Sequence, residues 1–300
     1  MKILKVIEYI KSVIDRFQYK DSNWKINVTD EKIFKTTEKV LIYVIHIHGC
    51  FIPKFMINNV EYWRAKGFTP VLVITYSNVN KLSMMDILEK NLPECNYFIR
   101  DNRGKDFGGI GDLCRKFDLT KCEQILLMND SFIGPFYDSN LFERLSEVKS
   151  DVVGVTESFE ILYHLQSSLI YIKNSKSISH FINFFIKKYK PYNSRMNIIR
   201  EGEIGLTQYF LSNGVSVRAL YNIPHLLTNY SFPGGVNELT KINSQHYFGE
   251  NIFIHEGFPY LKRELLTRNQ MKLSINYGEI MNKLNSIERD NLNEAIIARV

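Results

Sequence analysis

The 300 residues suit one large domain or two small ones, and 45% apolar with 23% charged residues exclude a disordered chain and a coiled coil. A mean hydropathy of −0.18 and the lack of an apolar run long enough for a membrane span indicate a soluble protein. The net charge of +6 favours phosphate-bearing ligands or an anionic membrane face and requires neither.

The cysteines and the first residues indicate a cytoplasmic protein. Four cysteines are far apart, with no C-x-x-C pair: Cys50, Cys95, Cys114 and Cys122. This spacing argues against a disulfide framework or a zinc ribbon and favours a reducing cytosol. Lysines interrupt each apolar run of residues 1–20 and no small-residue cleavage site follows, so we expect no secretory signal.

Residues 1–20 form an amphipathic pattern. Apolar residues recur every three or four positions, at Ile3, Leu4, Ile7, Ile10, Val13, Ile14 and Phe17, with Lys and Arg on the other face. This pattern predicts a helix. This helix either packs on the domain or lies on the anionic inner face of the cytoplasmic membrane.

Residues 39–150 alternate between strand and helix patterns. Buried strands are expected at 40–49, 70–77, 95–102 and 124–131. Helices are expected at 52–66, at 81–91, and from Gly108 or Gly109 to about 117. This alternation predicts an α/β fold with a mainly parallel sheet, whose ligands bind beyond the carboxyl ends of the strands.

The remaining residues mix both patterns. Strands are expected at 151–158, 166–173 and 215–221, and helices at 178–189 and 203–214. Residues 271–300 predict one or two amphipathic helices. We therefore expect helical extensions at both ends of the α/β domain.

The segment 99–112, IRDNRGKDFGGIGD, joins a strand to a helix and matches neither a Walker loop nor G-x-G-x-x-G. Its glycines let the backbone approach a ligand closely, and the helix start offers N–H groups to a phosphate. The alternative is a glycine-rich turn without a ligand.

A second candidate is Asn129-Asp130-Ser131, which ends an apolar strand. An aspartate delivered in this way can hold Mg²⁺ or Mn²⁺ against a diphosphate, whereas a turn-capping aspartate is the alternative. Two histidines, His46 and His48, alternate on one strand and point to one face. His246 is either a metal ligand or a hydrogen-bonded structural residue.

Polar groups that could bind sugar hydroxyls gather in residues 156–168, and the strongest candidates are Thr156, Glu157, His164 and Gln166. Glu201 and Glu203 begin the predicted helix at 203–214. Carboxylates in a first turn are favoured by the helix dipole. The functional alternative for Glu203 is a general base.

Taken together, these segments resemble the rhamnan synthesis F protein family, bacterial polysaccharide glycosyltransferases with a GT-A-like, Rossmann-related fold. The resemblance rests on blocks at 100–109, 126–136, 154–172, 203–211 and 257–266. It covers about residues 40–270 and implies a glycosyltransferase domain at 39–270. The N-terminal helix and linker (1–38) and the C-terminal helical extension (271–300) lie outside it and are expected from their patterns alone. Within the domain it implies a nucleotide-sugar half (39–150) and an acceptor half (151–270).

The resemblance also implies roles for these residues. The donor diphosphate site would contain His46, His48, Asn102, Gly104, Lys105, Asp106, Gly108, Asn129 and Asp130. The acceptor side would contain Thr156, Glu157, His164 and Gln166. Glu203 would deprotonate the acceptor hydroxyl in an inverting reaction, and Asp130 would hold the cation. His246 is a further candidate ligand that the residues alone suggest. The D-x-D metal motif of the fold is incomplete, because Met128 or Asn129 fills its first acidic position.

The function implied is transfer of a hexose or deoxyhexose from a nucleotide-diphosphate sugar to a glycan or lipid-linked glycan of the cell surface. The alternative is a scaffold or nucleotide-sugar-binding protein of a polysaccharide assembly complex, without turnover. A Rossmann oxidoreductase would need a glycine fingerprint after the first strand, where IHIHGCF stands instead. No nucleic-acid-binding module is present in the sequence.

Overall fold

The computed structural model describes residues 2–19, 26, 28–32, 37–232, 234–269 and 272–297, and the side chains of residues 2–5, 19 and 236 are excluded from the description. Most of the linker expected before residue 38 and the last three residues of the expected C-terminal extension lie outside these ranges.

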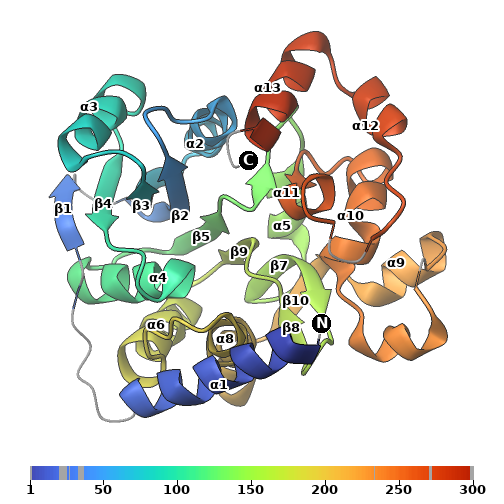
Figure 1. The fold of residues 1–300 in the computed structure, drawn as a ribbon, viewed down its shortest axis with the longest axis horizontal. Coiled ribbons are helices and arrows are strands. Elements are labelled where there is room, and N and C mark those ends of the chain that lie inside the picture. The colour runs from blue at the N-terminus through green and yellow to red at the C-terminus, as the bar shows by residue number, and fades with distance from the viewer. Residues whose placement is uncertain are drawn as a thin grey trace.

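A nine-stranded sheet, counted over the described residues, crosses the molecule in the order β1-β4-β3-β2-β5-β9-β7-β10, with β8 paired to β7 (Figure 1). Its strands are β1 (Val28–Lys32), β2 (Lys39–His48), β3 (Thr69–Ser77), β4 (Asn96–Arg100), β5 (Gln124–Asn129), β7 (Val152–Ser158), β8 (His164–Leu165), β9 (Leu169–Ile172) and β10 (Val217–Tyr221). A separate ribbon pairs β6 (Phe132–Ile133) with β11 (Leu261–Lys262).

The centre of the sheet is parallel, as the alternation of strands and helices predicts. Strands β4, β3, β2 and β5 run in one direction, and β9 runs antiparallel to both β5 and β7. The carboxyl ends of the parallel strands therefore share one edge with the start of β9. The expected α/β class with a mainly parallel sheet flanked by helices is confirmed.

Helices cover both faces of this sheet (Figure 1). They are α1 (Lys2–Tyr19), α2 (Lys54–Ala65), α3 (Lys81–Asn91), α4 (Lys105–Lys116), α5 (Leu141–Glu147), α6 (Ser175–Asn183), α7 (Arg195–Asn197), α8 (Gly205–Ser212), α9 (Ile223–Asn229), α10 (Ser244–His255), α11 (Arg263–Leu266), α12 (Tyr277–Lys283) and α13 (Ser286–Ile297). Two π-helical segments, η1 (Phe184–Lys188) and η2 (Ile198–Ile204), and a 3₁₀ helix, η3 (Val236–Lys241), complete them.

Two apolar cores follow from the alternation of side chains along buried strands. On β2, Leu41 and Tyr43 enter the core beneath α2, α3, α5 and α10, whereas Ile42 and Val44 enter the core beneath α4, α6 and α8. Because both faces are buried, the strand is a continuous apolar run rather than an alternating one.

The helix expected at 203–214 is part of a longer helical segment, which is a correction. Helix starts at Arg195 in α7 and continues through η2 into α8. Glu203 therefore lies in a π-helical turn and not in a first turn. Close packing of Gly202 against Phe107 contributes to this arrangement, because an added Cβ would lie 2.9 Å from the Phe107 ring.

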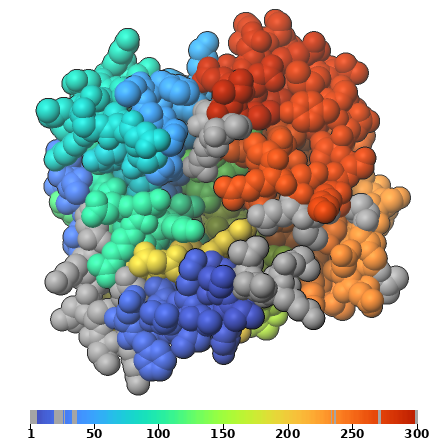
Figure 2. Space-filling model, viewed as in Figure 1, coloured from blue at the N-terminus to red at the C-terminus, as the bar shows by residue number. Residues whose placement is uncertain are grey.

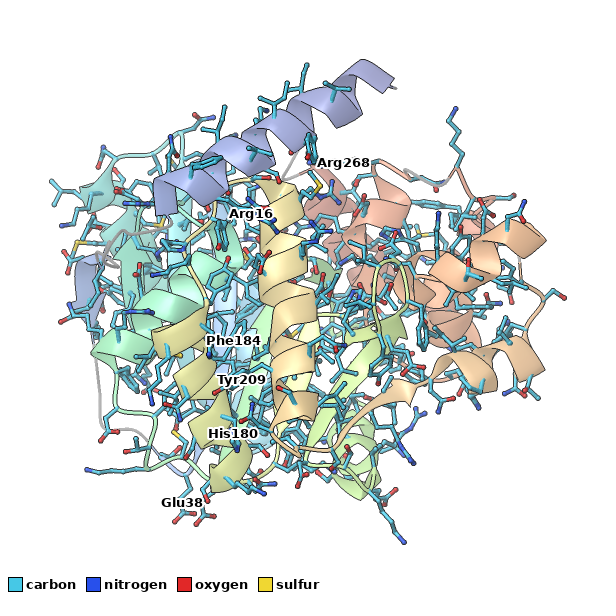
Figure 3. All side chains as sticks on the ribbon, turned by 90° about the horizontal axis from the view of Figure 1, so that it is seen from below. Arg16, Glu38, His180, Phe184, Tyr209 and Arg268 are labelled. Carbon is cyan, nitrogen blue, oxygen red and sulfur yellow. The ribbon has the colours of Figure 1, made fainter. Side chains whose placement is uncertain are left out.

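Aromatic side chains pack the α7–η2–α8 segment against α6 and η1. The rings of Phe184 and Tyr209 lie 5.6 Å apart between centroids, and His180 packs on the edge of Tyr209 at 6.3 Å (Figure 3). This buried contact holds the helical layer that carries Glu203.

The start of α4 is a second correction, because the helix begins at Lys105 and not near Gly108. Gly104 precedes it in the left-handed conformation, with φ of 72°. The amide of Gly108 already donates to the Gly104 carbonyl at 2.8 Å. Its N–H is therefore used within the helix, and the open amides of the first turn lie earlier.

Several elements were not expected from the sequence: β1, β6, β8, β11, α5, α9 and α10. The two expected C-terminal helices are present as α12 and α13. Within the described part of the chain, no helix has both the length and the apolar character needed to cross a bilayer.

Candidate active site

A polar cluster lies where the carboxyl end of β5 meets the start of β9, and Lys262 is at its centre. The Lys262 ammonium donates to the Ser131 hydroxyl at 3.1 Å and to the Ser168 hydroxyl at 3.0 Å. The Ser168 hydroxyl also donates to Gln245 at 3.0 Å. We call Lys262, Ser131, Ser168 and Gln245 the Lys262 cluster; it joins β11, β6, β9 and α10.

Asn129 connects this cluster to the glycine-rich segment. Its side-chain amide donates to the Asp106 carboxylate at 3.1 Å, and its side-chain oxygen accepts the backbone N–H of Ser131 at 3.1 Å. Asp106 is in the first turn of α4, where a carboxylate is favoured by the helix dipole. Two residues predicted from the sequence, Asp106 and Asn129, are therefore brought together.

Carboxylates surround the Lys262 ammonium. Burial lowers the pKa of Lys262, while the charges of Glu203, Glu264 and Asp106 act to raise it. Arg195, also within electrostatic range, lowers it. The residue as a whole is of intermediate exposure, and its ammonium is desolvated among these groups.

Glu203 lies on the helical side of this cluster. Its Oε1 atom accepts the backbone N–H of Ser167 at 2.6 Å, which fixes the carboxylate beside the start of β9. Among the described residues, no hydrogen-bond partner is found for its Oε2 atom. The carboxylate is partly exposed and is held in one orientation.

Glu264 and His246 form a further pair. His246 Nε2 is 3.6 Å from Glu264 Oε2. The contact with His246, together with the nearby charges of Lys262 and Arg195, lowers the pKa of Glu264 to about 2. His246 thus has a carboxylate partner, whereas the sequence left open whether it would be a metal ligand or a structural residue.

A buried ion pair holds the loop before α4. Arg100 Nε donates to Asp112 at 2.9 Å, and both side chains are almost fully buried. The same guanidinium donates to the carbonyl of Arg103 at 2.6 Å. From the other side, the Asn193 side chain accepts the N–H of Gly104 at 3.0 Å. These contacts fix the start of α4 and hence Asp106.

The glycines of this segment pack against protein atoms. A Cβ on Gly108 would lie 2.3 Å from the Arg103 carbonyl oxygen, and one on Gly109 would lie 2.6 Å from Val73. A Cβ on Gly104 would lie 3.2 Å from Pro191. The glycines therefore let α4 approach its own loop and the sheet, and this accounts for their positions without a ligand.

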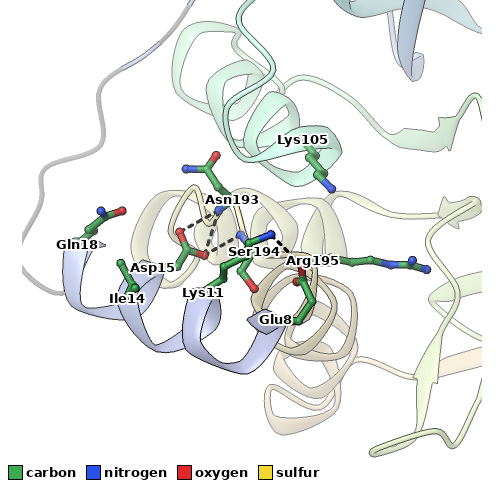
Figure 4. A pocket seen from close by; sticks show the side chains of 9 residues that line it. All are labelled: Glu8, Lys11, Ile14, Asp15, Gln18, Lys105, Asn193, Ser194 and Arg195. Atoms are coloured by element: carbon green, nitrogen blue, oxygen red, sulfur yellow. Dashed lines mark hydrogen bonds and ion pairs between the residues drawn. The ribbon is translucent and has the colours of Figure 1, made fainter. Parts of the chain in front are cut away.

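A cavity of about 350 Å³ opens beside this region, between α1 and the loop before α7 (Figure 4). Lys105 and Arg195 lie on the side opposite α1. Arg195 is also within electrostatic range of Lys262. Both basic residues are exposed, as is Asn102 in the preceding loop.

The histidines of β2 lie at the same sheet edge but are held by β3. His46 contacts Thr75 at 2.8 Å and Ser77 at 3.0 Å, and His48 contacts Ser77 at 2.9 Å. Both side chains lie on one face of the strand, as expected. No contact between these rings and the Lys262 cluster is present among the described residues.

Asp130 turns away from its neighbour Asn129. Its Oδ2 atom accepts the backbone N–H of His46 at 3.0 Å, and the residue is 8% exposed. The carboxylate thus caps a backbone group between β2 and β5. This geometry matches the capping alternative for Asp130.

The structure offers no preformed metal cage in the residues it describes. They contain no group of three or more His, Cys, Asp or Glu side chains that could hold a metal. Asp130 and His246 have the partners given above and do not converge with a third ligand. A cation bound mainly by diphosphate oxygens needs only one or two carboxylates.

The four residues predicted for the acceptor are all buried. Glu157 accepts the N–H of Ile223 at 2.8 Å, and burial raises its pKa. His164 contacts the Leu162 carbonyl at 2.8 Å, and the Gln166 side-chain amide donates to the Asn243 side-chain oxygen at 2.8 Å. Thr156 faces a small internal void beside Gln245 and Lys262. Because all four are buried, they offer little surface to a glycan in this structure.

Sequence reasoning missed Lys262 and Ser168, and it included Ser131 only as part of the Asn129-Asp130-Ser131 candidate. Lys262 stands in the block 257–266, where it is a cation directly after apolar Tyr260 and Leu261. That contrast is the only local signal. Its place beside Ser131 depends on the pairing of β11 with β6, which no periodicity predicts.

The fold and this cluster define an α/β protein with its candidate site at the carboxyl edge of a mainly parallel sheet. The family model described as rhamnan synthesis protein F matches residues 71–291. The chain therefore belongs to the rhamnan synthesis protein F family.

Two relatives extend this comparison. The chain is 26% identical to the virulence protein VirA of Vibrio anguillarum over 296 residues, covering 91% of this chain and 92% of that protein. It is 35% identical over 130 residues to the uncharacterized protein y4gN of Sinorhizobium fredii, covering 41% of this chain and 34% of that protein.

Solved structures give weaker matches. A putative glucose-1-phosphate thymidylyltransferase from Bacillus anthracis aligns with a TM-score of 0.36 and 14% identity, covering 60% of this chain and 87% of that one. The mannosyltransferase PcManGT from Pyrobaculum calidifontis, in complex with GDP-Man and Mn²⁺, aligns with a TM-score of 0.32 and 10% identity, covering 99% and 95%. Both TM-scores are too low to show a shared fold.

Proposed function

We propose that the protein is a glycosyltransferase of GT-A type that moves a hexose or deoxyhexose from a nucleotide-diphosphate sugar to a hydroxyl of a surface polysaccharide. Membership of a rhamnan synthesis family supports the polysaccharide product. The observation that carries the proposal is the Lys262 ammonium beside the Glu203 carboxylate at the carboxyl edge of the sheet.

The proposed reaction is a single displacement. The acceptor oxygen attacks the anomeric carbon, and the bond from that carbon to the diphosphate oxygen breaks with its electron pair on the diphosphate. The acceptor proton passes to the Glu203 carboxylate. A held carboxylate with one open oxygen suits a general base, because proton transfer requires hydrogen-bond reach and a fixed orientation.

The leaving diphosphate carries negative charge that must be neutralised. Lys262 and Arg195 lie within electrostatic range of one another, and Lys105 lines the same cavity as Arg195. The open amides at the start of α4 add favourable partial charge. We propose that these groups hold the donor diphosphate, with Asp106 and Asn129 fixing the geometry around them.

A divalent cation, Mg²⁺ or Mn²⁺, remains a prediction. It would supply charge neutralisation at the diphosphate. Asp106 is the carboxylate best placed for it, because it is partly exposed and close to Lys262. Asp130 is a less suitable ligand, since its carboxylate is occupied by the His46 backbone N–H.

The donor sugar, the glycan or lipid-linked glycan acceptor and an inverting outcome belong to the same proposal. A cytoplasmic location, with contact at the inner membrane face, is proposed with them. The alternative, a scaffold without turnover, differs in one measurable respect. A scaffold releases no nucleoside diphosphate from any sugar donor.

The test is release of nucleoside diphosphate from UDP-, dTDP- and GDP-sugars by the purified protein, with water as the slow acceptor. The proposal predicts release from one nucleotide class, and an arm with EDTA measures metal dependence. Binding of a donor without release by the wild type over many hours would favour a nucleotide-sugar-binding protein without turnover. Neither binding nor release would reject the transferase and favour the scaffold.

A further inference from the structure

We propose that α1 docks on the surface of an anionic lipid bilayer through its outward apolar face. That face consists of Val6, Ile7, Tyr9, Ile10, Ile14 and Phe17, and each of these residues is at least 42% exposed. Phe17 reaches 74% and Tyr9 62%. Figure 2 shows α1, in dark blue, lying on the outside of the molecule.

The polar face of α1 packs on the protein. Asp15 is buried and accepts the backbone N–H groups of Asn193 at 3.0 Å and Ser194 at 2.9 Å (Figure 4). Asn197 donates to the Ser12 carbonyl at 2.8 Å and to Asp15 at 3.2 Å. Rotating the helix to bury its apolar side would leave these buried polar groups without partners, which is costly.

This orientation is the reverse of an ordinary amphipathic helix, which turns its apolar stripe to the core. The sequence predicts the helix but left open whether it packs on the domain or lies on a membrane. The structure shows that α1 contacts the domain through its polar side and leaves the apolar side open. Packing of α1 on the domain and contact of α1 with a membrane are therefore compatible.

The charges on α1 identify the partner. The helix has four basic residues, Lys2, Lys5, Lys11 and Arg16, and two acidic ones, Glu8 and Asp15. Glu8, Lys11 and Asp15 line the cavity between α1 and the domain. The Lys11 side chain is nevertheless 61% exposed and pairs with Glu8 at 3.3 Å. An apolar face bordered by basic residues suits the interface of an anionic membrane.

A second copy of the chain is a poorer occupant of this face. A two-fold contact would set α1 against α1 and bring the basic residues of both copies together. Anionic lipid headgroups pair with the same residues instead. The net charge of +6 on the whole chain also favours contact with anionic lipid.

Docking through α1 would orient the candidate site toward the bilayer. Arg16 forms an ion pair with Glu201, two residues before Glu203, and the cavity beneath α1 contains Lys105 and Arg195. An acceptor held at the membrane surface would reach this opening over a short distance. The docking itself does not depend on the proposed transferase activity.

The test is co-sedimentation of the full chain with large vesicles of phosphatidylcholine, with and without phosphatidylglycerol. The wild type should sediment with the anionic vesicles only. The double variant Ile10→Asp, Phe17→Asp should lose binding by at least about tenfold, because two apolar groups no longer enter the interface. Lys11→Gln should weaken binding about fivefold, the contribution of one basic residue near such a surface.

The matched control is Leu82→Asp on α3, which changes an equally exposed residue, 75% accessible, away from α1. It should sediment like the wild type, and circular dichroism checks that each variant folds. Failure of the wild type to bind anionic vesicles would overturn the proposal. So would equal binding by the double variant, or a wild-type dimer that this variant dissociates without any lipid binding.

Discussion

The Lys262 ammonium donates to the Ser168 hydroxyl at 3.0 Å, and so joins residues 94 positions apart in the sequence. This contact connects the β6–β11 ribbon to the start of β9 at the edge where the parallel strands end. A cation here has little solvent around it, and Glu203, Glu264 and Asp106 are its charged neighbours. An incoming diphosphate would meet a positive group with few competing water molecules.

The first prediction concerns Glu203. Glu203→Gln keeps the shape of the side chain and removes its basicity, so turnover should fall about 10²- to 10⁴-fold while donor affinity changes little. Steady-state release of nucleoside diphosphate measures the first quantity, and calorimetry with the same donor measures the second.

The control for this variant is Glu201→Gln, which alters a carboxylate two residues away that pairs with Arg16. It should keep turnover within a few-fold of the wild type. Near-normal turnover of a folded Glu203→Gln protein would remove Glu203 from the mechanism.

The second prediction concerns Lys262. Lys262→Met keeps a long, unbranched side chain but removes its charge. Donor affinity should therefore fall by about ten- to a hundredfold, which is the range for losing a charge-assisted hydrogen bond. Uncharged sugars or nucleosides, tested by calorimetry, should show no such loss. Lys81→Met, at an exposed pair with Asp30, is the control. Equal donor affinity in Lys262→Met would mean that this ammonium does not touch the diphosphate.

The third prediction concerns the ion pair between Arg100 and Asp112. Asp112→Ala leaves a buried guanidinium without its carboxylate, and the free energy of unfolding should fall by about 3–5 kcal/mol. Urea unfolding measures this loss. Asp112→Asn keeps a hydrogen-bond acceptor and should lose less, which provides a folded variant if Asp112→Ala does not fold.

An exposed pair gives the comparison. Glu61→Ala breaks the contact of Glu61 with Arg64 at 2.7 Å, and it should cost less than about 1 kcal/mol. A cost for Asp112→Ala no larger than this would show that the ion pair does not hold the loop before α4.

The fourth prediction concerns pH. The pKa of Glu264 falls from 4.5 to about 2 in the folded protein, chiefly through its contact with His246. A carboxylate whose pKa is lower in the folded protein stabilises the fold when the pH is above its pKa in the unfolded protein. This stability is lost as the pH falls from about 4.5 through 2. The stability difference between the wild type and Glu264→Gln should therefore shrink between pH 5 and about pH 3.

Chemical unfolding of both proteins at these two pH values measures that difference. A difference that stays constant would show that the Glu264 carboxylate gains nothing from His246 in the folded state.

Much of the fold could be predicted because its signals are local. The strands β2, β3 and β5 are continuous apolar runs. Short strands such as β8 and β11 have only two residues each. They exist because of their partners, so no periodicity marks them.

The candidate site could be predicted only in part. Asp106, Asn129 and Glu203 were found because each is a polar residue at the end of a strand or in a helical segment. The glycines near them suggested a ligand, but contacts with Arg103 and Val73 explain their positions. Hydrophobic periodicity also predicted α1 without showing which side of the helix faces the protein. That choice depends on the buried contacts of Asp15.

The most direct measurement is a thermal-shift screen of the wild type against UDP-, dTDP- and GDP-sugars, with a CMP-sugar as the donor that lacks a diphosphate, each with and without Mn²⁺. A donor at 100 times its dissociation constant should add about 2.7 kcal/mol to the stability of the folded protein, which is a readable shift. A donor site at the Lys262 cluster predicts a shift with one class of diphosphate donor, and loss of that shift in Lys262→Met. No shift with any nucleotide sugar, at concentrations that saturate known transferases, would contradict a donor site at the Lys262 cluster.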